Sequence, residues 1–135
     1  PMVAGIVLHL LGQIHSLTKQ NNFKPEDITE SIINKARIIF RTNIDRDISI
    51  ESVAEELNVS YAWFRKSFKA YSGIAPHQYL LQLKIEKAKI LLADPSLQIK
   101  EIALLLNFKS PFYFSKLFGE KTGLSPDQFR KAMHR

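Results

Sequence analysis

The side chains of this sequence that are best suited to chemistry are basic and aromatic, and they gather in residues 61–69 and 109–116. Arginine and lysine donate hydrogen bonds to phosphates and base edges, and apolar side chains contact thymine methyl groups. These residue types therefore indicate non-covalent recognition of DNA. The candidate DNA-binding residues are Tyr61, Ala62, Arg65, Lys66, Lys69, Lys109, Ser110, Pro111, Phe112, Tyr113, Ser115 and Lys116.

The residue types that catalysis or metal binding would need are missing or wrongly spaced. The sequence has no cysteine, which excludes disulfides, cysteine-ligated metal centres and thiol nucleophiles. His9 and His15 are six positions apart, a spacing that does not place them on one helical face, and His77 and His134 have no partner at ligand spacing. No glycine-rich phosphate loop or nucleophile elbow is present. We therefore expect neither an enzyme nor a bound cofactor or metal.

The net charge of +6 is distributed unevenly along the 135 residues. Residues 1–56 hold six basic and eight acidic side chains, whereas residues 57–135 hold thirteen and five. A basic excess confined to one part of a chain favours a polyanionic partner for that part. The longest apolar stretch, residues 2–17, is shorter than the roughly 20 residues of a membrane-spanning helix, so no membrane partner is expected. The absence of cysteine suits the reducing cytoplasm.

Hydrophobic residues recur every three or four positions along the chain, a spacing that predicts an all-α fold. Serine and glycine mark the ends of several expected helices, because serine caps helix N-termini and glycine terminates helices. We expect helices over residues 2–19, 26–42, 50–57, 61–71, 76–92, 99–106, 111–121 and 126–134.

The sequence contains one unit twice. Residues 50–59 align with residues 99–108 at an offset of 49 positions. After one inserted residue, Lys109, residues 60–79 align with residues 110–129 at an offset of 50, and seven of these twenty positions are identical. The identical residues of the first copy are Ser60, Phe64, Lys66, Phe68, Gly73, Pro76 and Gln78. Because caps, helix breakers and aromatics all match, the repeat indicates a duplicated fold.

Each copy reads as a short helix, a tight turn and a second helix capped by serine, which is the pattern of a helix-turn-helix. Asn58 and Asn107 lie at the turns, where asparagine tolerates a left-handed backbone. The helical period turns Phe64 and Phe68 inward in the first copy, and Phe114, Leu117 and Phe118 inward in the second. The candidate DNA-binding residues then lie on or beside the outward faces that would enter a major groove. For the lysines, a merely solvated surface is the alternative interpretation.

The helix expected over residues 76–92 joins the two copies. At 1.5 Å per residue it is about 25 Å long. With one helix-turn-helix at each end, it could place two recognition helices about 34 Å apart, which is one turn of DNA. A monomer could thus occupy two successive major grooves.

The N-terminal segment predicts an amphipathic helix with a narrow apolar seam. The seam residues recur at steps of four and three, as in a coiled coil, and they are Val3, Val7, Leu10, Ile14 and Leu17. Two interpretations remain open, a homodimer formed through residues 3–17 and a helix that packs on its own chain.

The C-terminal part of the sequence resembles the DNA-binding domain of the AraC/XylS family of bacterial transcription regulators, over about residues 28–135. The segments that carry the resemblance are residues 63–69, Gly73, Pro76, and residues 99–103, 107–118 and 121–130. The resemblance implies two helix-turn-helix subdomains joined by a linker helix, binding to a promoter operator in double-stranded DNA, and an RNA polymerase partner. It also implies base contacts at Ala62, Arg65, Lys66, Pro111, Phe112 and Lys116.

Three residues depart from the family pattern. Asn107 replaces a usual turn glycine, Gly119 replaces a usual lysine, and Lys84 stands where the family often has arginine. Gly119 would remove one phosphate contact, which would shift affinity towards the first copy.

The resemblance also suggests how the chain is organised. Residues 1–24 are interpreted as an N-terminal helix and connector, the remnant of a missing sensor or dimerisation region, and residues 25–135 as the DNA-binding domain. Within that domain we expect a first unit over about 28–75, the linker helix over about 76–93 and a second unit over about 96–135. The expected function is that of a sequence-specific DNA-binding regulator that activates transcription. The alternative is a helical interaction module with only non-specific affinity for nucleic acid.

Overall fold

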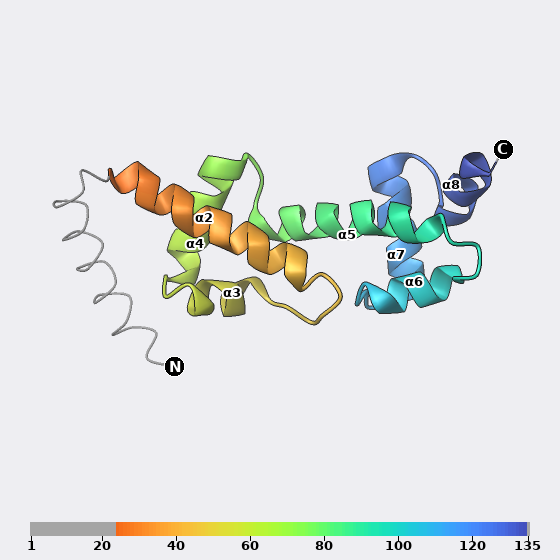
Figure 1. The fold of residues 1–135 in the computed structure, drawn as a ribbon, viewed down its shortest axis with the longest axis horizontal. Coiled ribbons are helices and arrows are strands. Elements are labelled where there is room, and N and C mark those ends of the chain that lie inside the picture. Colours follow the sequence, from red (N-terminus) through yellow and green to blue (C-terminus); the bar gives the residue numbers. More distant parts are fainter. Residues whose placement is uncertain (1–23, 135) are drawn as a thin grey trace. The chain divides into compact units, whose positions relative to one another are not determined.

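The computed structural model describes residues 24–134, and within them it contains seven helices and no strand (Figure 1). The all-α prediction is therefore confirmed for the described part. The helices are α2 (Pro25–Thr42), α3 (Ile50–Glu56), α4 (Tyr61–Ser72), α5 (Pro76–Leu92), α6 (Ile99–Leu105), α7 (Pro111–Thr122) and α8 (Pro126–Met133). The predicted N-terminal helix and its seam lie outside the described residues.

The helix ends lie within one residue of the boundaries that the sequence predicts, because local side chains fix them. Ser60 and Ser110 cap α4 and α7, with each hydroxyl oxygen accepting a hydrogen bond from the backbone N–H three residues later, at 3.1 and 3.0 Å. Gly73 and Gly123 end the same helices with φ of 83° and 84°. Glycine adopts this left-handed conformation without a steric penalty.

The turns of the two helix-turn-helix motifs have the same backbone geometry. Asn58 and Asn107 adopt left-handed conformations with φ of 60° and 58°. In the first turn, the N–H of Val59 donates to the carbonyl of Ala54 at 3.0 Å, and in the second the N–H of Phe108 donates to the carbonyl of Ala103 at 2.9 Å. Asparagine thus serves at both turns, including the position where the resemblance would place glycine.

The described residues divide into two compact units. Unit 1 consists of residues 24–42 and 48–79, and unit 2 of residues 43–47 and 80–134. The core of unit 1 contains four aromatic rings, Phe40, Phe64, Phe68 and Tyr79, with centroid separations between 5.3 and 6.4 Å. These rings join α2, α4 and the first turn of α5.

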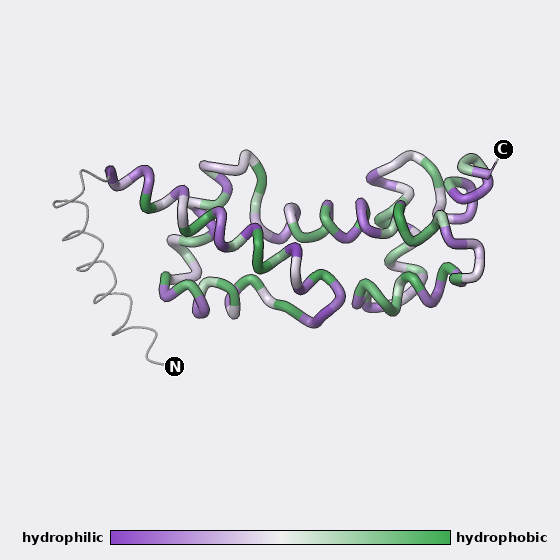
Figure 2. Tube along the Cα trace, viewed as in Figure 1, coloured by the Kyte–Doolittle hydropathy of each residue, from purple (hydrophilic) through white to green (hydrophobic). Residues whose placement is uncertain are grey.

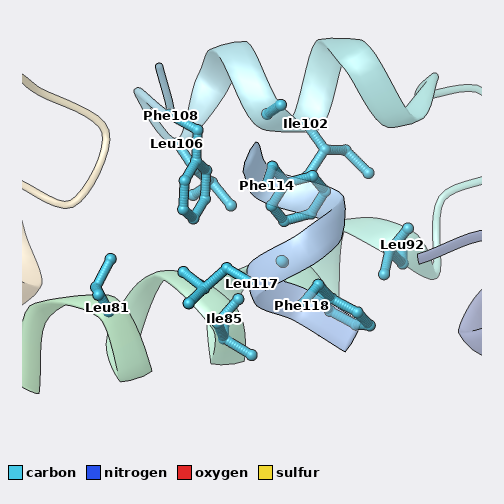
Figure 3. Close-up of a cluster of buried hydrophobic side chains, with 11 residues drawn as sticks. Leu81, Ile85, Leu92, Ile102, Leu106, Phe108, Phe114, Leu117 and Phe118 are labelled. Atoms are coloured by element: carbon cyan, nitrogen blue, oxygen red, sulfur yellow. The ribbon is translucent and has the colours of Figure 1, made fainter. Parts of the chain in front are cut away.

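Unit 2 has a corresponding core, in which Figure 3 shows Phe114 and Phe118 of α7 between side chains of α5 and α6. Phe108, Phe114, Phe118 and Phe129 form a chain of ring contacts with centroids 5.0 to 5.8 Å apart. Phe114 and Phe118 are fully buried, as the helical period predicts. Burial of these rings in each unit fixes which face of the second helix remains outward.

The duplication extends to the helix that precedes each motif, which sequence comparison had not shown. Ile33, Ala36 and Phe40 of α2 are buried, and at an offset of 52 positions Ile85, Ala88 and Leu92 of α5 are buried as well. The hydropathy of both helices alternates accordingly (Figure 2). The first turn of α5 belongs to unit 1 and its remainder to unit 2. One helix therefore completes the first unit and begins the second.

In each unit, an arginine side chain hydrogen-bonds to the C-terminal end of another helix. In unit 1, Arg37 donates to the Ser72 hydroxyl at 2.8 Å, which ties α2 to the end of α4. In unit 2, Arg130 of α8 donates from Nε to the carbonyl of Leu92 at 3.0 Å and from Nη2 to the carbonyl of Asp94 at 3.1 Å. The Leu92 carbonyl lies at the C-terminus of α5 and the Asp94 carbonyl two residues beyond it, where a cation is also favourably placed in the helix dipole.

Within residues 24–134, no helix has both the length and the apolar character that a membrane span requires.

Candidate nucleic-acid interface

Helix α4 presents a basic outward face from unit 1. Phe64 and Phe68 point into the core with no exposed surface. At 100° per residue this turns Arg65, Lys66 and Lys69 outward, and all three are exposed. Ala62 is exposed on the same helix and leaves room around Arg65 and Lys66 for a large partner. The structure thus places the first set of candidate residues on one accessible surface.

The Arg65 guanidinium lies over the ring of Tyr61, 5.4 Å from its centroid. Tyr61 is the first residue of α4, one turn before Arg65. A cation is attracted to the negative face of an aromatic ring, so this contact restricts the conformations of the arginine side chain. Arg65 is therefore partly ordered on a helix surface where an isolated arginine would be free.

Helix α7 presents a different outward face from unit 2. Phe114, Leu117 and Phe118 are buried, which leaves Pro111, Phe112 and Lys116 exposed. Ser115 is half-buried beside Lys116, and Lys109 is exposed immediately before the helix. The candidate residues of the second copy therefore also share one end of one helix. Ser110, half-buried, caps that helix through its hydroxyl oxygen.

Tyr113 is held by the core of unit 2 at the edge of this surface. Its ring lies 6.1 Å from that of Phe108, and the residue retains 37% exposure. Trp63 occupies the equivalent position on α4 and retains 36% exposure. The sequence interpretation omitted Trp63 from the candidate residues, although alignment of the two copies pairs it with Tyr113. We therefore add Trp63 to the candidates.

The structure shows the surroundings of two of the departures from the family pattern. Lys84 is buried in unit 2, with its ammonium 5.4 Å from the centroid of the Phe108 ring. Burial lowers the pKa of Lys84, and the Asp47 carboxylate partly opposes this by favouring the charged form. Gly119 is half-buried within α7, and a Cβ there would come no closer than 3.9 Å to another group, the carbonyl of Leu124. No steric requirement for glycine exists at that position.

The part of the chain that the structure describes offers no cluster of three or more histidine, aspartate or glutamate residues that could hold a metal ion. The pKa of Asp94 is lowered by hydrogen bonds from the hydroxyl and N–H of Ser96, which form a local turn after α5.

Comparison with known proteins shows the same architecture in transcription regulators. Residues 53–132 match a family model described as a helix-turn-helix domain. The chain is 28% identical over 125 residues to the HTH-type transcriptional activator RhaR of Salmonella schwarzengrund, an alignment that covers 90% of this chain and 44% of the relative. The chain thus spans less than half the length of this curated relative.

Solved structures of transcription regulators are also similar to this chain. The C-terminal domain of AraT, a response regulator from Geobacillus stearothermophilus, superposes with a TM-score of 0.72 and 35% identity, over 75% of this chain and 84% of that one. A transcriptional regulator of the AraC-type DNA-binding group from Chromobacterium violaceum superposes with a TM-score of 0.71 and 27% identity, over 76% and 91% of the two chains.

Proposed function

We propose that α4 and α7 are the two recognition helices of this chain, which belongs to the AraC/XylS family of helix-turn-helix transcription regulators. Membership makes the chain a sequence-specific DNA-binding regulator and not an enzyme. The finer assignment of helices and residues is supported by one observation. Helices α4 and α7 each bury one aromatic face in the core of their own unit and expose a face with basic or aromatic side chains.

In unit 1 the proposed base contacts come from Arg65 and Lys66. Arginine can donate two hydrogen bonds to O6 and N7 of guanine, a pattern that no other base pair offers in the major groove. Tyr61 holds Arg65 near the N-terminal half of α4, which is the part of a recognition helix that contacts bases. Lys69, about one helical turn further along, is better placed for a phosphate.

In unit 2 the proposed contacts come from the first turns of α7. Phe112 and Lys116 face outward there, with Pro111, Tyr113 and Ser115 beside them. Lys109 precedes the helix and is assigned to a phosphate. A phosphate contact contributes affinity and register without sequence information, whereas base contacts determine specificity.

The activity of the whole protein is proposed from the relatives of this chain. The curated relative RhaR is named a transcriptional activator. We propose that this chain is likewise part of an activator that binds a promoter operator, contacts RNA polymerase and acts in the cytoplasm. We further propose that the seam residues Val3, Val7, Leu10, Ile14 and Leu17 form a homodimer contact.

Selection from a random duplex library with residues 1–135 tests the proposed function. We expect enrichment of one motif, with Arg65→Ala relaxing one base pair of it and weakening binding by about 1–3 kcal/mol. Lys69→Ala should weaken binding to all sequences alike and lower the salt dependence by about one counterion. Lys131→Ala is the control, because Lys131 is paired with Asp127 at 3.0 Å on α8. Failure to enrich any motif would refute sequence-specific binding by this chain.

A further inference from the structure

We propose that the two recognition helices use different chemistry, and that α7 selects its half-site through Phe112, which contacts thymine C5-methyl groups. This inference rests on the proposed function, since it assumes that α7 lies in a major groove. It adds the base class that the second helix recognises and the residue that recognises it.

Phe112 is the most exposed aromatic residue in the described part of the chain, at 78% of its surface. The other exposed aromatic residues, Tyr61, Trp63, Tyr71 and Tyr113, retain only 36 to 41%. Within residues 24–134, Phe112 takes part in none of the ring contacts that build the two cores. The ring therefore contributes little to folding and remains available to a partner.

Alignment of the two recognition helices shows what changes around Phe112. Phe112 stands where α4 has Ala62, Ser115 stands where α4 has Arg65, and Gly119 stands where α4 has Lys69. Only the lysine at Lys66 and Lys116 is common to both outward faces. Compared with α4, the outward face of α7 has lost two cationic donors and gained a large apolar ring.

The major groove offers one apolar group on its base edges, the C5-methyl of thymine. An apolar ring therefore gains most by burying that methyl, and it would leave the donors and acceptors of other base pairs without partners. Pro111, exposed at the first position of α7, adds apolar surface beside Phe112. The surrounding charge favours DNA over an apolar protein surface, since Lys109 and Lys116 flank the ring.

The position of Phe112 is well defined because both of its neighbours in the chain are fixed. Pro111 sets the backbone at the start of α7, and the Ser110 hydroxyl accepts from the N–H of Tyr113 at 3.0 Å. The ring of Tyr113 packs on Phe108. Phe112 is thus carried by a rigid first turn, which limits the entropy lost when the ring meets a base.

The test uses residues 1–135 and the duplex obtained by selection, with uracil replacing thymine at single positions. Uracil keeps the base pairing and removes only the methyl group. We expect one or two replacements in one half-site to weaken binding about four-fold each, the value of one buried methyl-sized group. Phe112→Ala should weaken binding to the thymine duplex by at least as much and abolish the effect of uracil, whereas Phe112→Leu should keep part of it.

Controls separate this inference from the proposed function. Because Phe112 is exposed, its variants should keep the far-ultraviolet circular dichroism and melting temperature of the unchanged protein. Arg65→Ala should leave the uracil effect intact, since Arg65 belongs to the other half-site. Selective binding that is equally strong for thymine and uracil would overturn the methyl contact and leave the proposed function standing. Unchanged affinity and base preference in Phe112→Ala would also overturn it. Loss of all sequence preference in the unchanged protein would overturn both.

Discussion

Arg65 and Tyr61 form a pair in which the ring orders the guanidinium, 5.4 Å away, before DNA is bound. Removing the ring should free the arginine and reduce its discrimination for guanine. We expect Tyr61→Leu to weaken binding to the selected duplex about 2- to 5-fold, the range of an exposed cation–π contact. The measurement compares affinities for the selected duplex and for one in which the guanine is replaced by adenine.

The matched control is Tyr61→Phe, which keeps the ring and should keep the discrimination. If Tyr61→Phe loses as much guanine preference as Tyr61→Leu, the hydroxyl and not the ring is responsible, and the positioning role of Tyr61 is wrong.

The buried Lys84 makes the free energy of unfolding depend on pH. Burial lowers the pKa of Lys84 from 10.5, so its charged ammonium group destabilises the folded protein at neutral pH. As the pH rises from the lowered pKa towards 10.5, the unfolded chain holds the proton more strongly than the folded one, and stability from this residue rises. We expect Lys84→Met to raise the free energy of unfolding by about 1 kcal/mol near pH 7.

The gain from Lys84→Met should shrink as the pH approaches 10.5, because the neutral lysine no longer carries the burial penalty. Urea unfolding of both proteins across this range measures the difference. A loss of stability in Lys84→Met at neutral pH would show that attraction to Asp47 and the Phe108 ring outweighs burial.

At the scale of the element, Arg130 holds α8 against the end of α5 through two backbone carbonyls. Arg130→Ala removes both hydrogen bonds and leaves these carbonyls without the charged donor. We expect the free energy of unfolding to fall by about 2 kcal/mol. Urea unfolding, monitored by circular dichroism, measures this loss. Arg130→Lys should recover only part of it, since lysine lacks the planar fork. A variant as stable as the unchanged protein would show that the contact is dispensable.

Gly119 weakens α7 without a steric reason, because a Cβ at this position has room. Gly119→Ala should raise the free energy of unfolding by about 0.5–1 kcal/mol, the penalty of glycine within a helix. Gly119→Lys should also strengthen DNA binding and increase the salt dependence by about one counterion, as an added phosphate contact would. Titrations at several salt concentrations measure this, with Lys131→Ala as the reference for a charge change elsewhere. An unchanged salt slope in Gly119→Lys would place this position away from the phosphates.

The helices could be predicted from sequence because their ends are marked by local chemistry. Ser60, Gly73, Ser110 and Gly123 act within one turn of themselves, so neighbouring residues suffice to locate them. The relation between α2 and α5 was not predicted, since it lies outside the segments aligned from the sequence and shows itself in the burial of three apolar positions, two of them identical in both helices. The burial of Lys84 was not predicted either, because lysine is rarely buried and only the fold places Phe108 beside it. The DNA contacts stay predictions, since exposure alone does not identify a partner.

At the scale of the whole molecule, the proposal requires two half-sites on one duplex. We expect the half-site centres to lie about 10 base pairs apart, which is one turn of DNA. Inserting five base pairs between the half-sites should lower affinity at least ten-fold, because one helix would then face the opposite side of the DNA. The same insertion outside the half-sites is the control. Equal affinity for both duplexes would show that the units do not bind in a fixed register.

Methylation protection of guanine N7 on the selected duplex directly tests major-groove recognition by α4 and α7, because N7 lies in the major groove. We predict protection around the half-site bound by α4 and its loss in Arg65→Ala. We also predict that guanines placed at the second half-site are protected about 10 base pairs away on the same face of the DNA. Full reactivity at both half-sites while the protein is bound would contradict major-groove recognition by these two helices.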